Sequence, residues 1–360
     1  MQSEFHAIKS FGVWMNSGMP PIVAGHEDQV AVDAVQARAK AVWPRIASDL
    51  GLAAEGARFR QLMVNSRYQH VRSVQMVQTA TGQRYVLRAV FDEINAAKQL
   101  KSLDRHQLAS ERLRAVPGVS SPSILWRDRD SGVVLMEFAE GDTAYRALSL
   151  SDYGLGERAE VLRRIGHAVA ALHRVSDVGD QRFWPKPFLK QVSTRAEAVR
   201  AGQFQVPKPK KFLGLCALLH RAGRAARGQV FRGAIEHGDL HLRNIMMSDT
   251  DVSFIDYSNH KGIYPYRDIA DIWISNCPDH LAPDGCQPGF GGIASADWAA
   301  FEDGYGMRLT VDPLFRFFFT WRLFRLWSAL AARPSYQHRR TADALAGALR
   351  VLDALLEDGA

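Results

Sequence analysis

The sequence predicts an α+β protein of two lobes, in which a small antiparallel β-sheet with one helix precedes a mainly helical remainder. Three observations lead to this expectation. Runs typical of β-strands gather before residue 140, helical apolar stripes dominate after residue 141, and one short polar island with β character, 236–257, interrupts those helices. Of the 360 residues 47% are hydrophobic and 23% are charged, which is a globular composition and excludes a disordered chain.

The expected first lobe covers residues 27–140 and follows a loose leader, 1–26, which is punctuated by Gly and Pro and lacks periodicity. Its strands are runs rich in β-branched and aromatic residues, and its helices follow the 3.6-residue period. The expected elements are, in order, a helix over 28–50 with a kink or break at Pro44, strands over 59–64, 71–79 and 84–90, a helix over 92–116 stopped by Pro117, and strands over 123–127 and 132–138.

The expected second lobe covers residues 141–360 and is built from helices around the polar island. Apolar stripes at helical spacing predict helices over 161–172, 191–203, 211–227, 296–306, 312–332 and 340–357. The run 314–327 carries many aromatic residues and three arginines, so it either lies on a membrane surface or forms a buried core helix. We favour the core helix, because aromatic residues surround nearly every side of it.

Charge and cysteine content narrow the class of protein. Lys and Arg number 45 against 38 Asp and Glu, a formal net charge of +7. Such a balance can reflect nucleic acid, an anionic membrane or an anionic substrate, but we favour a solvated basic surface and expect no nucleic-acid partner. The three cysteines give no disulfide framework, and Cys277, His280 and Cys286 match no common zinc pattern. With neither a signal peptide nor an apolar stretch of ~18 residues, we expect a cytoplasmic protein.

The most informative segment is the motif His-Gly-Asp-Leu-His-Leu-Arg-Asn-Ile at 237–245, which an Ile-Asp pair follows at 255–256. Asp239 and Asn244 have the spacing of the catalytic loop of protein kinases. At this spacing a carboxylate can face a hydroxyl while the amide, one loop turn further on, faces Mg²⁺. Asp256 ends a β-type run, where a second carboxylate can bind the same metal. We therefore expect phosphoryl transfer, which needs mainly alignment and charge neutralisation.

The string HGDLHLRNIM, with FIDYSN placing its Asp twelve residues after the Asn, resembles the aminoglycoside phosphotransferase and choline kinase-like group. The resemblance implies a protein-kinase-like fold with ATP (or GTP) and Mg²⁺ as cofactors. It implies a catalytic loop made by Asp239 as base, His241 as loop organiser and Asn244 as metal ligand, with Asp256 as a second metal ligand. It further implies an adenine hinge at Glu137 and Phe138, within Leu-Met-Glu-Phe-Ala-Glu-Gly.

Two regions depart from the pattern of that group. Kinases place a Lys on the third strand to hold the phosphates, whereas register here gives Arg88, which binds phosphate bidentately but is larger. Its helix partner is expected to be Glu111, with Glu93 second, unless Glu111 is a solvated surface residue. The loop between the first two strands lacks the glycines of a phosphate loop, so either Ser66 and Arg67 bind phosphate by side chain or the loop is an ordinary hairpin connection.

The segment from Asp268 to Asp303 carries seven acids and no Lys or Arg. In the resembled group this region helps to wall the acceptor pocket. The acids either form a wall suited to a cationic acceptor or are solvated and balance the basic remainder. Asp268, in an Arg-Asp-Ile-Ala string that resembles the Asp-Leu-Ala of the group, is expected to hold the catalytic loop by hydrogen bonds. The Pro- and Gly-rich run 278–292 is expected to be a mobile loop or lid.

Taken together, the residues favour a Mg²⁺-dependent phosphotransferase that moves the γ-phosphate of a nucleotide to a hydroxyl of an aminoglycoside-, amino alcohol- or sugar-like small molecule. Two alternatives stay open. Arg88 and the weak phosphate loop favour a catalytically silent kinase-fold binding module, although the complete set of Asp239, Asn244 and Asp256 opposes it. A lipid or lipopolysaccharide sugar kinase would bring 314–327 to a membrane surface. The oligomeric state is not predicted.

Overall fold

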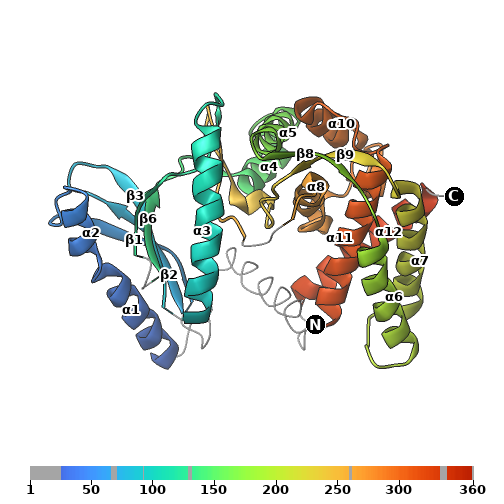
Figure 1. Ribbon diagram of the computed structural model, residues 1–360, viewed down its shortest axis with the longest axis horizontal. Helices are drawn as coiled ribbons and strands as arrows, with labels where there is room; N and C mark the ends of the chain where they lie inside the picture. Colours follow the sequence, from blue (N-terminus) through green and yellow to red (C-terminus); the bar gives the residue numbers. More distant parts are fainter. Residues whose placement is uncertain are drawn as a thin grey trace. The chain divides into compact units, whose positions relative to one another are not determined.

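The computed structural model describes residues 26–65, 71–91, 93–128, 132–258, 262–332 and 339–358. These residues form two compact units, drawn in Figure 1, which we call the N-lobe and the C-lobe. The N-lobe holds the described residues up to 103 together with 123–138, and the C-lobe holds 104–122 and those from 139 onward. Residues 104–122, at the end of a long helix, therefore group with the C-lobe, whereas the predicted boundary lay at 140. Nearly all of the predicted leader falls outside the described residues.

The N-lobe is a five-stranded antiparallel sheet in the order β1-β2-β3-β6-β5. All five predicted strands are confirmed: β1 (Arg58–Asn65), β2 (Arg72–Gln78), β3 (Arg84–Val90), β5 (Ile124–Arg127) and β6 (Val133–Glu137). The predicted helix between β3 and β5 is α3 (Glu93–Leu113). The first predicted helix is broken as expected, into α1 (His26–Lys40) and α2 (Trp43–Asp49), with Pro44 in the first turn of α2.

Alternation along the strands explains the N-lobe core. Leu87 and Ala89 are buried on one face of β3, because side chains two apart on a strand share a face. They pack with Trp43 and Ile46 from α2 in one hydrophobic cluster. Arg88, between them in sequence, points to the opposite face of the sheet and pairs in register with Val74 on β2.

The C-lobe is mainly helical, and the predicted helices are confirmed within a few residues at each end. Its helices are α4 (Ala144–Asp152), α5 (Arg158–Val175), α6 (Lys186–Arg200), α7 (Pro209–Ala226), α8 (Pro265–Ile274), α9 (Cys277–His280), α10 (Ser295–Tyr305), α11 (Pro313–Ala331) and α12 (Arg339–Glu357), with the 3₁₀ turns η3 (Leu242–Asn244) and η4 (Phe290–Gly292). Helices α4, α8 and α9 were not predicted, and α9 overlaps the start of the run 278–292 that was expected to be a loop.

Two small sheets complete the C-lobe. One has the order β4-β11-β10-β7, with β4 (Val119–Ser120), β7 (Asp142–Thr143), β10 (Ile245–Met247) and β11 (Val252–Phe254); the other is the antiparallel ribbon of β8 (Asp177–Arg182) and β9 (Val230–Ala234). Gly141 must be a glycine beside the first sheet. Its φ is +93°, and a Cβ there would lie 1.9 Å from the carbonyl oxygen of Met247.

Helix α11 is the core helix of the C-lobe, as the favoured interpretation expected. Its side chains are buried on every side, and its phenylalanines pack among aromatic rings from other segments, including Phe183 and Tyr264. Its one fully buried cation, Arg322, forms an ion pair with Asp271 of α8. The run 314–327 is therefore not a membrane-facing surface. Among the described residues, no helix is both long and apolar enough to cross a membrane.

Candidate active site

A short hairpin brings Asn244 and Asp256 of the sequence motif together. Strands β10 and β11 pair with Ile245 opposite Phe254, and the Ile255 N–H donates to the Asn244 carbonyl at 3.0 Å. Asn244 and Asp256, twelve residues apart in sequence, therefore lie at the same end of one hairpin. The ring of His237 donates through Nε2 to the Ile255 carbonyl at 3.0 Å, which ties the start of the motif to the same place.

Asp239 is buried beside these residues. The Asn244 Nδ2 donates to the Asp239 backbone carbonyl at 2.8 Å, closing the loop between them. Burial, and then the negative charges of Asp256 and Asp271, raise the pKa of Asp239 to about 8. The carboxylates of Asp239 and Asp256 thus lie close enough to repel each other, which is the arrangement expected of groups that share a cation.

Asp256 has a strained backbone. Its φ of +63° lies in the left-handed region, which non-glycine residues rarely adopt. Strain of this kind costs on the order of 1–3 kcal/mol and gathers at functional sites, where surrounding bonds impose it. The flanking bonds here are Ile255 N–H to Asn244 and Ser258 N–H to the His237 carbonyl, at 3.0 Å each.

Asp268 holds the catalytic loop by hydrogen bonds to its backbone, as predicted. Its two carboxylate oxygens accept from the backbone N–H groups of His237 at 2.7 Å and Gly238 at 2.9 Å. His173 of α5 adds a third contact at 3.3 Å, while its other ring nitrogen contacts the Tyr305 hydroxyl at 3.1 Å. Desolvation opposes ionisation of this fully buried acid, but the hydrogen bonds lower its pKa overall.

His241 caps the turn that follows it in the loop. Its Nδ1 accepts from the Arg243 N–H at 3.2 Å and so caps η3. Burial lowers the pKa of His241 to about 4, which keeps the ring neutral and able to accept this bond. The Arg243 guanidinium lies 3.7 Å from the ring centroid of Tyr145 on α4, and this contact fixes the far side of the turn.

A second buried network around Glu236 was missed by sequence reasoning. Glu236 is 1% exposed, accepts from the Tyr264 N–H at 2.9 Å and lies 3.4 Å from the Arg267 guanidinium. Burial raises its pKa to about 7 despite Arg267. Arg105 of α3 donates to the backbone carbonyls of Glu236 and Ser258, on either side of the loop. The only sequence signal was the position of Glu236 next to the motif.

The predicted nucleotide-binding residues of the N-lobe lie on its sheet. Glu137, at the end of β6, is exposed and accepts from the Ser123 N–H at 2.8 Å through Oε2. Phe138 follows it, with the Arg84 guanidinium 4.9 Å from its ring centroid. Arg88 occupies the middle of β3. These placements stay compatible with the predicted hinge and phosphate contact.

Glu111, the proposed partner of Arg88, is exposed on α3 and accepts a hydrogen bond from Gln107 at 2.7 Å. It belongs to the part of α3 that groups with the C-lobe. Its pairing with Arg88 stays a prediction. Ser66, the proposed phosphate ligand, and its neighbour Arg67 lie outside the described residues, and so does the side chain of Glu93.

The acids between Asp268 and Asp303 are largely engaged within the C-lobe. Six of the seven have protein partners: Asp268 with the catalytic loop, Asp271 with Arg322, Asp279 with Tyr145, Asp297 with Arg158, Glu302 with Thr310 and Arg308, and Asp303 with Arg163. Such pairing fits acids that balance basic residues better than it fits an open acidic wall. The segment 278–292 closes on itself through the bridges Leu281–Ile293 and Pro288–Ala294.

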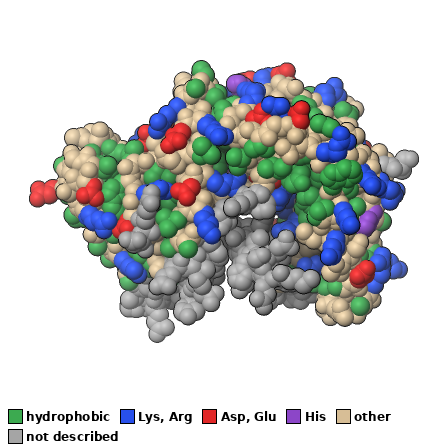
Figure 2. Space-filling view, in the orientation of Figure 1, with side chains coloured by type: hydrophobic (Ala, Val, Ile, Leu, Met, Phe, Trp, Pro, Cys, Tyr) green, Lys and Arg blue, Asp and Glu red, His purple; other side chains and the backbone are tan. Residues whose placement is uncertain are grey.

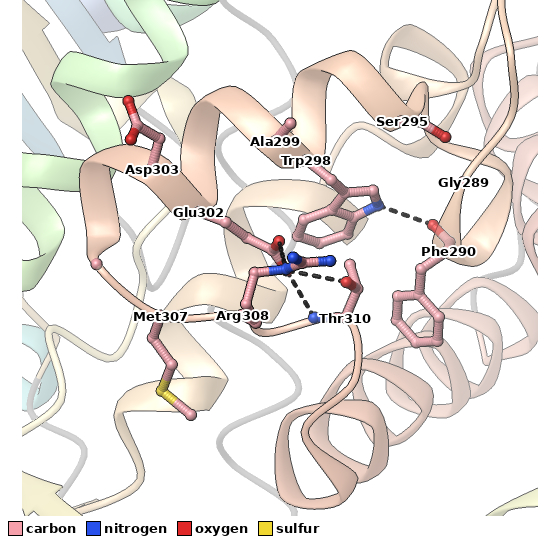
Figure 3. Close-up of a pocket in the computed structure, with 11 residues that line it drawn as sticks. Gly289, Phe290, Ser295, Trp298, Ala299, Glu302, Asp303, Met307, Arg308 and Thr310 are labelled. Atoms are coloured by element: carbon pink, nitrogen blue, oxygen red, sulfur yellow. Dashed lines mark hydrogen bonds and ion pairs between the residues drawn. The ribbon is translucent and has the colours of Figure 1, made fainter.

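A hollow of about 640 Å³ lies against α10, away from the motif residues (Figure 3). Trp298 and Phe290 line it, and the indole N–H donates to the Phe290 carbonyl at 2.9 Å. Glu302, at its base, accepts from the Thr310 N–H and hydroxyl at 2.7 and 2.9 Å. Asp239, Asn244 and Asp256 do not line this hollow, and its buried polar groups are already satisfied.

The donor set at the hairpin suits a hard divalent cation bound together with phosphates. Carboxylate and amide oxygens from Asp256 and Asn244 are ligands that Mg²⁺ accepts. Within the described part of the chain no group of three or more His, Cys, Asp and Glu side chains could hold a metal unaided. Mg²⁺ is usually bound by one or two carboxylates plus substrate phosphates. Cys277 and His280 are buried, and Cys286 is exposed.

An antiparallel sheet with a helix, followed by a helical lobe that carries this loop and hairpin, defines the protein-kinase-like fold. The profile of the phosphotransferase enzyme family matches residues 68–303. The chain therefore belongs to that family, and the resemblance found in the motif is confirmed.

Solved structures share the fold over nearly the whole chain. An amicoumacin kinase in complex with AMP-PNP, Ca²⁺ and its ligand is 14% identical with a TM-score of 0.54, covering 93% of this chain and 96% of that one. A macrolide 2′-phosphotransferase from Brachybacterium faecium is 15% identical (TM-score 0.52, 86% and 98% covered). A choline/ethanolamine kinase family protein from Mesorhizobium loti is 16% identical (0.52, 90% and 99%). A comparison with curated proteins finds no match.

Proposed function

We propose that this phosphotransferase moves the γ-phosphate of ATP or GTP, with Mg²⁺, onto a hydroxyl group of a small molecule. One observation carries the proposal. Asp239, Asn244 and Asp256 are brought together by a hairpin and a loop that are hydrogen-bonded to each other. Phosphoryl transfer has a loose transition state, so a rigid array of oxygen ligands and a positioned carboxylate are the main requirements.

Each side chain takes a role that its surroundings support. Asp239 orients the acceptor hydroxyl and receives its proton as a carboxylate, because the loop that Asn244 closes positions it beside the proposed metal ligands. Asp256 binds Mg²⁺ through its carboxylate, and Asn244 binds through Oδ1, since its Nδ2 is engaged by the Asp239 carbonyl. The metal, when bound, neutralises charge on the transferred phosphate.

The N-lobe residues take the nucleotide in this proposal. Arg88 steadies the α- and β-phosphates, and Glu137 and Phe138 mark the adenine hinge. A guanidinium is a strong bidentate phosphate ligand, so it can replace the usual Lys without loss of charge.

The acceptor class follows from the family and from the closed C-lobe core. The solved structures named above include an amicoumacin kinase and a choline/ethanolamine kinase family protein, whose names point to small-molecule acceptors. Burial of α11 removes the surface that a lipid acceptor was expected to use. A small, water-borne acceptor is therefore the better-supported class.

The decisive experiment is a phosphate-transfer screen of aminoglycosides, amino alcohols, sugars and lipids with radiolabelled ATP and GTP. Asp239→Asn serves as the blank, since it keeps size and fold but removes the base. We expect Mg²⁺-dependent transfer to at least one non-lipid acceptor by the wild type alone. Equal labelling by wild type and blank would exclude the assigned role.

The silent binding module is tested separately by nucleotide thermal shift. The active enzyme should be stabilised by nucleotide plus Mg²⁺ more than by nucleotide alone, because Asp256 and Asn244 bind the complex through the metal. A nucleotide-induced shift in unfolding temperature that is the same with and without Mg²⁺, or no shift at all, would favour the silent module.

A further inference from the structure

Positive charge is concentrated in one segment of the C-lobe. Residues 181–235 contain twelve Lys and Arg and a single acid, Glu197, which gives a local net charge of +11 against +7 for the whole chain. This segment comprises the end of β8, helices α6 and α7, and most of β9. The excess charge of the protein therefore comes entirely from the α6–α7 hairpin and the ribbon beside it.

At one end of this segment an exposed tryptophan sits among cations. Arg182 on β8 pairs in register with Val230 on β9, and the Phe183 N–H donates to the Gln229 carbonyl at 2.9 Å. The next residue, Trp184, is 52% exposed, and the Arg227 guanidinium lies 5.7 Å from its ring centroid. The β8–α6 and α7–β9 junctions thus meet and present Trp184 and Val230, which is 59% exposed, on one surface.

Exposed cations extend this surface along both helices. Lys186 opens α6 two residues after Trp184, and Arg224 lies one helical turn before Arg227 at the end of α7. We call this set the Trp184 patch: Arg182, Trp184, Lys186, Arg224, Arg227 and Val230. In Figure 2 hydrophobic side chains gather where Figure 1 draws β8 and β9, and Lys and Arg side chains follow α6 and α7 beside them.

The cations of the Trp184 patch lack carboxylate partners in the described part of the chain, unlike their neighbours. Arg232 pairs with Asp177 and Asp180, and Lys211 pairs with Asp353. Arg182 instead donates to the Gly228 carbonyl at 3.4 Å, which leaves its charge uncompensated. Unpaired charge of one sign around exposed apolar side chains indicates a surface that meets an external anionic partner.

We propose that the Trp184 patch binds peripherally to the surface of an anionic lipid bilayer. Tryptophan favours the headgroup level of membranes, where its ring meets acyl chains and its N–H meets water. Lys and Arg gain about fivefold in affinity for each charge near an anionic leaflet. A nucleic acid could bind the same cations. The apolar part of the patch, however, consists of one tryptophan and Val230, and the aliphatic Val230 cannot stack on a base but can contact acyl chains.

This surface differs from the membrane contact that the sequence suggested. That contact used the aromatic run of α11, which is buried. The Trp184 patch does not contain Asp239, Asn244 or Asp256, so membrane attachment and phosphoryl transfer are separable. The inference goes beyond the proposed function and does not depend on which acceptor is used.

The test is co-sedimentation of the full chain with vesicles of phosphatidylcholine, with and without phosphatidylglycerol, at low and at physiological ionic strength. Lys186→Glu/Arg224→Glu changes four charge units in the patch. Arg58→Glu/Arg60→Glu makes the same change on exposed positions of β1. Trp184→Ser tests the apolar component, against Tyr153→Ser, which removes a side chain 83% exposed elsewhere.

We expect binding only to phosphatidylglycerol vesicles, a loss of more than tenfold for Lys186→Glu/Arg224→Glu and at most a twofold loss for Arg58→Glu/Arg60→Glu. Trp184→Ser should weaken binding severalfold at physiological salt, where the apolar part matters more, and Tyr153→Ser should not. Equal effects of patch and control variants, or no sedimentation with phosphatidylglycerol, would overturn the proposal. So would tighter binding of duplex DNA than of vesicles at the same salt, which would assign the patch to nucleic acid.

Discussion

The catalytic loop and the N-lobe sheet place their functional side chains in opposite ways. In the loop, the polar groups are buried and fixed by named hydrogen bonds, as Asp268 fixes His237 and Gly238. On the sheet, an apolar core holds the backbone, and Glu137 and Phe138 lie at the surface of β6 and just beyond it. A loop of that kind resists substitution at every member, whereas a sheet surface tolerates exchange of one ligand for another, as Arg88 in place of Lys suggests.

The largest effect is expected within the loop. Asp239→Asn should lower turnover by about 10³-fold or more, since the general base is lost, while nucleotide affinity stays within twofold. Asp256→Asn should also lower turnover and should in addition weaken binding of Mg²⁺-nucleotide. Steady-state kinetics and calorimetric titration separate the two variants. Unchanged turnover in either one would contradict the contrast with the sheet.

The second largest effect is expected at Asp268, whose carboxylate holds the loop by hydrogen bonds. Asp268→Ala leaves two buried N–H groups and His173 without an acceptor, and each lost partner costs about 1–3 kcal/mol. We expect about 3–5 kcal/mol less stability in urea unfolding, as is usual for a broken buried network. Asp284→Ala, at an exposed position of the same acidic segment, is the control and should change stability by less than about 0.5 kcal/mol. Similar effects of the two changes would show that the loop is not rigidly held.

Buried histidines should give the C-lobe a pH dependence. Burial lowers the pKa of His280, which packs against Trp273, to about 4 in the folded state. The unfolded chain then binds more protons between pH 4 and about 6.5, so this contribution is complete above pH 6.5 and is lost as pH falls toward 4. The loss is on the order of 3 kcal/mol for one such group. His280→Gln should flatten the stability-against-pH curve in this window, and an unchanged slope would contradict it.

The smallest effect belongs to the sheet. Arg88→Ala should weaken nucleotide binding about tenfold, because one charge-assisted phosphate contact is worth about 1.5–3 kcal/mol. Arg88→Lys should recover most of that loss, since a sheet surface accepts either cation. Equilibrium binding of a fluorescent nucleotide measures both. If Arg88→Lys weakened nucleotide binding as much as Arg88→Ala, the sheet surface would tolerate substitution no better than the loop does.

The same contrast explains what the sequence could and could not predict. The strands of the N-lobe and the spacing of Asp239, Asn244 and Asp256 were recognised because their information is local: alternation, turns and a motif within twenty residues. Ribbon β8–β9 was missed because β8 is polar, with Asp-Val-Gly-Asp-Gln-Arg, and its partner strand lies about fifty residues later.

Helix α8 was missed for a related reason. Asp268 and Asp271 interrupt its apolar pattern, and both face the interior because their partners come from distant segments. The acids after Asp268 likewise find Arg158, Arg163 and Arg322 far away in the chain. The spacing of residues in the sequence does not show which distant residues form ion pairs. An acidic wall around the acceptor and a set of acids neutralised by arginines within the lobe were therefore equally compatible with the sequence.

The ion pair between Arg322 and Asp271 limits how far the chain can be shortened from its C-terminal side and still fold. The match to the family model ends at residue 303, yet the cation that offsets the cluster of Asp239, Asp256 and Asp271 comes from α11, nineteen positions further on. A shortened chain that stopped at the family boundary would leave Asp271 buried without its counter-charge and α8 without its packing partner. A gene fragment that ends at the family boundary, residue 303, should therefore yield insoluble protein.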